Sequence, residues 1–175
     1  TLAHIYQQPF AAFYLPRPPA KKYPKVKDYR TLPKVRQGVI SSELTLEIRR
    51  AAERREIALE LYEEQEELPP IFNLRAELAN EPEMLANFIR EKLGIKFAKQ
   101  SMWRNPETAL AKWKVLIEEL GILVFQTSDR KLTVKEVRGF SISESSLPVI
   151  VVNRKDAPQA KIFTMDDLLR LPSVS

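Results

Sequence analysis

The spacing of apolar residues along this chain changes at Gly121, from a helical period to a strand period. Helices are expected over ranges 41–66, 81–93, 106–120 and 158–171. The strand pattern is found in ranges 122–125, 138–143 and 149–153. Helices and strands that do not alternate regularly are typical of the α+β class. We therefore expect helices packed on a small three-stranded antiparallel sheet.

Capping residues mark where three of these helices begin. Ser41 or Ser42 can cap the long helix of segment 41–68, because a side-chain oxygen can accept the unpaired N–H groups of a first turn. Asn105 and Asp156 each stand just before a proline at or near the first helical position, where the missing N–H costs nothing. We expect helices to begin at these three points.

Residues 1–40 differ from the rest of the chain in charge and in proline content. Eight Lys and Arg residues against one Asp give this segment a net charge of +7, while the whole chain carries +5. Range 1–15 has apolar residues at helical spacing, and so short a helix must pack on another domain, on the rest of the chain or on a second copy. Range 16–40 is rich in proline, which blocks a regular helix, so we expect an extended linker there.

The basic linker is also the candidate contact with nucleic acid, because phosphate groups attract any positive charge within reach. The candidate contacts are Lys21, Lys22, Lys25 and Lys27. A solvated linker accounts for the same residues without a partner.

The composition excludes several kinds of chemistry. The chain has no Cys, which removes disulfides, thiolate metal sites and Cys nucleophiles and fits a reducing compartment. Its one histidine, His4, is expected to be a half-exposed helix residue, and no glycine-rich phosphate motif is present. No stretch reaches the roughly 18 apolar residues that span a bilayer, so we expect a cytoplasmic protein that contacts no membrane.

Three segments in the second half of the chain resemble, in the same order, segments of the ImmA/IrrE family of regulatory zinc peptidases. They are Arg138-Gly139-Phe140-Ser141, Leu147-Pro148-Val149-Ile150-Val151-Val152-Asn153 and Ala160-Lys161-Ile162-Phe163-Thr164-Met165. The resemblance covers about residues 71–165 and implies a partial peptidase domain over 71–175. Residues 2–15 also resemble the closing helix of the Xre-type helix-turn-helix domain that many members carry in front, which implies DNA contact through a domain before Thr1.

The resemblance implies a zincin-like fold, in which a His-Glu-x-x-His helix holds Zn²⁺ and its Glu activates water. Intact members cleave a repressor or another regulatory partner after a stress signal. In this chain the first His position falls on Asp167, the Glu position on Leu168 and the second His position on Leu171. Because leucine offers a metal no lone pair, we expect no catalytic residue, no metal ligand and no bound cofactor here, and zinc only in an intact family member.

Three functions remain open. The match is strong up to Met165 and is lost after it, which favours a truncated or interrupted peptidase of a stress-linked or mobile-element-linked regulatory system. The second is a pseudo-peptidase that binds a partner by adding an extended peptide to a sheet edge, with Arg138, Phe140 and Ser141 as candidate contacts. The third is a DNA-associated transcriptional regulator or a toxin–antitoxin component.

Overall fold

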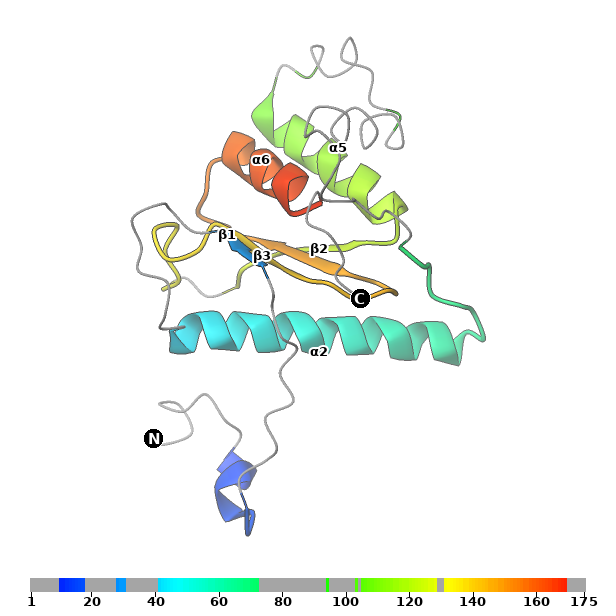
Figure 1. The fold of residues 1–175 in the computed structure, drawn as a ribbon, viewed down its shortest axis with the longest axis vertical. Coiled ribbons are helices and arrows are strands. Elements are labelled where there is room, and N and C mark those ends of the chain that lie inside the picture. The colour runs from blue at the N-terminus through cyan, green and yellow to red at the C-terminus, as the bar shows by residue number, and fades with distance from the viewer. Residues whose placement is uncertain are drawn as a thin grey trace, which may run out of the picture.

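The computed structural model of this chain describes residues 10–17, 28–30, 41–72, 94, 103, 105–128 and 131–169. Helix α2 (Ser42–Glu64) covers one face of a sheet, and helices α5 (Pro106–Glu119) and α6 (Pro158–Leu169) cover the other face (Figure 1). The strands are β1 (Asp28–Arg30), β2 (Leu123–Gln126), β3 (Gly139–Ile142) and β4 (Val149–Val152). The expected α+β class is confirmed.

The sheet is mixed and has four strands, in the order β1-β3-β4-β2. Strand β3 pairs antiparallel with β1 and with β4, whereas β2 runs parallel to β4. The expected three-stranded antiparallel sheet is therefore wrong. Strands β3 and β4 are neighbours and are joined by the short connection 143–148. Strands β2 and β3 are joined by the longer connection 127–138 and are not neighbours, because β4 lies between them. Apolar spacing predicts that strands exist, but it does not predict which strands are neighbours.

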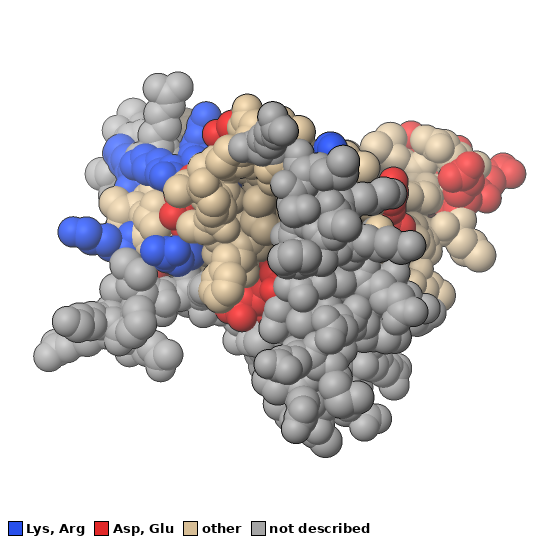
Figure 2. All heavy atoms as spheres, turned by 90° about the horizontal axis from the view of Figure 1, so that it is seen from above, with Lys and Arg blue, Asp and Glu red and all other residues tan. Residues whose placement is uncertain are grey.

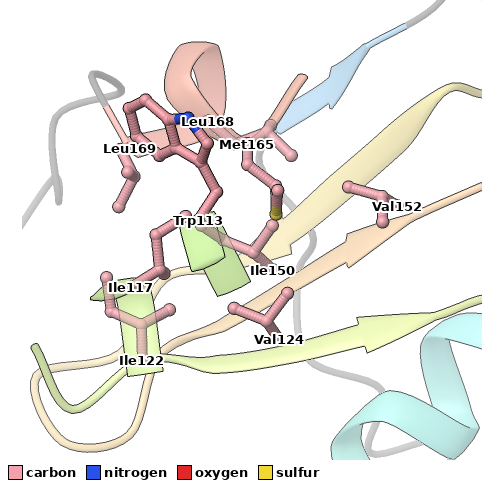
Figure 3. Close-up of a cluster of buried hydrophobic side chains, with 9 residues drawn as sticks. All are labelled: Trp113, Ile117, Ile122, Val124, Ile150, Val152, Met165, Leu168 and Leu169. Atoms are coloured by element: carbon pink, nitrogen blue, oxygen red, sulfur yellow. The ribbon is translucent and has the colours of Figure 1, made fainter. Parts of the chain in front are cut away.

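Strand β4 is buried on both faces of the sheet, which explains its unbroken run of apolar residues. Val149 and Val151 face α2 and pack with Leu44, Ile48, Ala51, Leu132, Val137, Phe140 and Ile142. Ile150 and Val152 face the opposite way and pack with Trp113, Ile117, Ile122, Val124, Met165, Leu168 and Leu169 (Figure 3). The two clusters together form the core on either side of the sheet.

Helix α2 packs on the sheet through its first half. Its expected cap is confirmed, since the hydroxyl of Ser41 accepts a hydrogen bond from the backbone N–H of Leu44 at 3.1 Å. Leu44 and Ile48 are each only 5% exposed. Ile57 and Leu61 are 54% and 49% exposed, because at about 100° per residue they lie on the side of α2 that faces away from the sheet. The apolar contacts that hold α2 on the sheet come from Leu44, Ile48, Ala51 and Ala52.

Helices α5 and α6 begin where their capping residues predict. Asn105 Oδ1 accepts a hydrogen bond from the N–H of Glu107 at 2.9 Å, and a proline follows the cap directly. The carboxylate of Asp156 accepts a hydrogen bond from the N–H of Ala157 at 3.0 Å, one residue before α6. Both expected helix starts are confirmed.

Segment 1–40 is described in two short pieces. Within the expected helix of range 1–15, Phe10–Tyr14 form a 3-10 helix without a buried residue. Three residues of the expected linker form β1, which pairs with β3 at the edge of the sheet. The expected helix over 81–93 lies outside the described residues. Among the helices that the structure describes, none has both the length and the apolar content needed to cross a membrane.

Candidate functional site

The centre of the candidate site is the contact between β3 and α6 at Gly139. A side-chain carbon added at Gly139 would lie 2.6 Å from the backbone oxygen of Val151 and 2.7 Å from Cγ2 of Thr164. Only a residue without Cβ therefore allows α6 to approach the sheet this closely. Because β4 also pairs with β3, the three segments that resemble the ImmA/IrrE family lie against one another.

Asn153 joins the turn after β4 to the residues that precede β3. Its side chain is fully buried, and its Nδ2 donates a hydrogen bond to the carbonyl of Val137 at 2.9 Å. Its Oδ1 accepts a hydrogen bond from the N–H of Lys155 at 3.0 Å, and its own N–H donates to the carbonyl of Arg138 at 2.7 Å. This role was missed from the sequence, although a polar residue directly after an unbroken apolar strand is a usable signal for it.

Arg138, a candidate partner contact, forms an ion pair with Asp156. The distance from Arg138 Nη1 to Asp156 Oδ2 is 3.5 Å, and the Asp156 side chain is only 8% exposed. The pair lacks hydrogen-bond geometry, since Arg138 Nε and Asp156 Oδ2 are both buried without a hydrogen-bond partner among the described residues. The guanidinium group is half-buried, so it retains a surface that a partner could reach.

The other two candidate contacts, Phe140 and Ser141, lie on opposite faces of β3. Phe140 is fully buried in the cluster that faces α2, so its ring has no surface to offer a partner. Ser141 lies in a small hollow with Leu168 and Leu169, and Glu144 also lines this hollow. The Ser141 hydroxyl is buried and has no hydrogen-bond partner among the described residues. The hollow has a volume of about 30 Å³, which is enough for roughly one or two water molecules.

The positions that resemble the zinc-binding motif fall at the end of α6. Asp167 is exposed, whereas Leu168 is only 5% exposed and packs in the core next to Gly139. Leu171, His4 and the four linker lysines lie outside the described residues. Within the part of the chain that the structure covers, no three His, Cys, Asp or Glu side chains are grouped so that they could hold a metal ion.

Glu47 is a buried carboxylate that the sequence analysis did not single out. It is only 2% exposed and lies on α2, where it accepts hydrogen bonds from the Ser128 N–H at 2.9 Å and from the Ser128 hydroxyl at 2.7 Å. Arg50 donates to the same carboxylate at 2.9 Å. These contacts fix the start of α2 to the end of β2. Because Glu47 and Ser128 are far apart in the chain, no local sequence pattern could have revealed the contact between them.

Comparison with protein-family models, with curated proteins and with solved structures found no match. The resemblance to the ImmA/IrrE family therefore rests on the three sequence segments alone. Chemically, the hollow beside α6 holds the buried hydroxyl of Ser141 between apolar walls, and the half-buried cation of Arg138 lies outside the lining of the hollow.

Proposed function

We propose that this chain is part of a cytoplasmic regulatory protein with a zincin-like domain of the ImmA/IrrE type, and that the described part recognises a repressor-like partner. The observation that supports this proposal is the contact of Gly139 with Thr164. This contact joins the segment that begins at Arg138 to the segment that begins at Ala160. The pairing of β3 with β4 joins the same first segment to the one that begins at Leu147. The three segments lie in β3, β4 and α6, which follow one another in the chain and pack as one unit.

The residues at the end of α6 bear on whether this chain can hydrolyse the partner that it is proposed to recognise. In the zincin mechanism the Glu next to the first His takes a proton from metal-bound water. Leu168 stands at this position, and its side chain can neither take a proton nor bind a metal. We therefore expect this chain to bind its partner without cleaving it in a zinc-dependent way.

The hydrolysis prediction is tested with zinc-loaded protein. After dialysis against buffer, we expect far less than one zinc per chain by elemental analysis and no chelator-sensitive cleavage of a mixed fluorogenic peptide substrate. Among the residues at the three motif positions, only Asp167 has a side chain with lone pairs for a metal. Asp167→Asn is therefore the matched variant, and its zinc content and its lack of cleavage should match those of the parent. One tightly held zinc per chain, or cleavage that the chelator abolishes, would contradict the prediction.

Recognition is tested with peptides selected from a displayed random library against the whole chain. We expect selected peptides to bind Ser141→Val about tenfold more weakly, because the variant fills the hollow and removes its hydroxyl. Ser145→Val is the matched control, since Ser145 is exposed and does not line the hollow. Selected peptides that bind both variants as they bind the parent would remove Ser141 from the recognition site.

A DNA-associated regulator or toxin–antitoxin component is the second candidate function. It is favoured by the net charge of +7 on residues 1–40. The expected contacts are Lys21, Lys22, Lys25 and Lys27. Weak and strongly salt-dependent DNA binding is expected from range 17–36, and unchanged binding after charge reversal at these lysines would reject it.

A further inference from the structure

Charged side chains are unevenly distributed over the folded domain. Figure 2 shows a group of Lys and Arg side chains at one end and a group of Asp and Glu side chains at the other, with further Asp and Glu side chains between them. The loop before β3 and the turn after β4 are joined by hydrogen bonds of Asn153, and together they carry several cations. We call them the basic surface, and its cations are Lys131, Lys135, Arg138, Arg154 and Lys155.

Buried hydrogen bonds hold the loop and the turn of the basic surface together. Asn153 bonds the loop at Val137 and Arg138, as described above. The N–H of Arg154 donates to Oγ1 of Thr127 at 3.2 Å, which ties the turn to the end of β2 as well. The cations of this surface therefore stand on a fixed backbone, so they lose little backbone entropy when they bind a ligand.

The carboxylates close to the basic surface are already engaged. Asp156 forms the ion pair with Arg138, and Glu136 accepts a hydrogen bond from the hydroxyl of Ser41. Lys135, Arg154 and Lys155 are exposed, and none of these three side chains forms an ion pair with another described residue. The positive charge of these three side chains is therefore not cancelled by an ion pair within the described part of the chain.

The acidic end makes the charge distribution of the domain asymmetric. It lies in the second half of α2 and the turn that follows, and its members are Glu53, Glu56, Glu60, Glu63, Glu64, Glu66 and Glu67. A molecule with separated charges turns its basic end toward a polyanion as it approaches, because the field of the whole charge distribution steers encounter.

Sequence segments that are themselves basic join the domain at the same end. Arg30 of β1 pairs with Gly139, next to Arg138. The chain then continues to Ser41, which bonds to Glu136 of the loop before β3. In the sequence, residues 31–40 between these two points carry two more cations and no acid.

We propose that the basic surface binds the phosphate backbone of duplex DNA. The exposed large apolar side chains of the described residues belong neither to the loop before β3 nor to the turn after β4: they are Phe10, Phe13, Tyr14, Leu15, Ile57, Leu61, Leu68, Ile71, Val115 and Phe163. Protein partners are usually anchored by aromatic and apolar residues, and single strands by bases that stack on aromatic rings. A fixed set of Lys and Arg without such anchors matches the phosphates of a duplex. This site is separate from the partner-recognition hollow, and it holds whether or not the proposed function is correct.

The test is fluorescence anisotropy of a short labelled DNA duplex of arbitrary sequence, titrated with the full chain at several salt concentrations. Arg154→Gln with Lys155→Gln should bind several-fold more weakly, and the slope of log affinity against log salt should fall by about 2 units, since each lost phosphate contact removes about 0.9. Lys135→Gln alone should lower the slope by about 1 unit. All three residues are exposed, so thermal unfolding of these variants should match that of the parent.

Lys112→Gln with Lys114→Gln is the matched control, because it removes the same charge from exposed positions on α5. This control should keep the parent slope. An equal loss in both double variants would show that net charge alone acts, and it would overturn the proposal. Tighter binding of the chain to a poly-glutamate peptide than to the duplex would assign the surface to an acidic protein and would overturn it as well. The proposal would also be overturned if charge reversal of the linker lysines abolished DNA binding while Arg154→Gln with Lys155→Gln had no effect on it.

Discussion

Gly139 is the residue on which the packing of α6 against the sheet depends most directly. Its hydrogen atom occupies a space in which any Cβ would come closer than real Cβ atoms do to a backbone oxygen and to a methyl group. The neighbouring Thr164 hydroxyl is buried without a described hydrogen-bond partner, so the contact is shaped by volume and not by hydrogen bonding. A glycine inside a strand is recognisable in the sequence, but the reason for it lies in α6, more than twenty residues away.

Gly139→Ala should destabilise the fold by about 1–3 kcal/mol, because the added methyl group forces β3 and α6 apart. In a Thr164→Ser background the same change should cost less, since one of the two clashing atoms is then gone. Chemical denaturation of the four proteins of this double-mutant cycle measures the coupling. Equal costs in both backgrounds would place the strain at the Val151 carbonyl alone.

Helix α2 has two sides with different surroundings. One side is fixed to the sheet by apolar contacts of Leu44 and Ile48 and by the hydrogen bonds of Glu47. Arg55 reaches across to the loop before β4, where its Nε donates to the carbonyl of Leu147 at 3.1 Å. Ile57 and Leu61 are exposed, because they lie on the opposite side of the helix from Ile48.

The same substitution at two places on α2 tests this difference between the two sides of the helix. Ile48→Ala should cost about 2–4 kcal/mol of unfolding free energy, because it opens a cavity in the core between α2 and β4. Ile57→Ala, an identical change at an exposed site, should cost less than about 1 kcal/mol. Urea unfolding of both variants gives the comparison. Similar costs would mean that the outer side of α2 is also packed in solution.

Strand β1 connects the basic segment to the rest of the molecule. The carbonyl of Arg138 faces β4, where it accepts from Asn153, so alternation along β3 turns the backbone groups of Gly139 and Ser141 toward β1. In the observed register these two residues stand opposite Arg30 and Asp28. The edge of β3, where we expected an extended partner peptide to add, is thus occupied by the chain's own strand.

A proline placed in β1 tests this pairing. Asp28→Pro removes an N–H that faces β3, so hydrogen exchange at the Ser141 amide should become at least several-fold faster. Tyr29→Pro is the matched control, because the N–H of Tyr29 points away from β3 and proline is tolerated at such an edge position. Exchange rates at Ser141 from NMR distinguish the two. Unchanged exchange in Asp28→Pro would show that β1 does not protect this edge.

The type and the start of most described elements were determined by the sequence itself, because apolar periodicity and capping side chains act within a few residues of the backbone they organise. Asn105 and Ser41 are examples, since each bonds an N–H two or three residues ahead. The tertiary structure alone decided that β2 runs parallel to β4, that β1 joins the sheet, that Phe140 faces the core and that Ser141 keeps a hydroxyl without a described partner. It also decided that five separated cations stand on one surface. These features depend on contacts between residues that are distant in the chain, and such contacts form only when the helices and strands pack together.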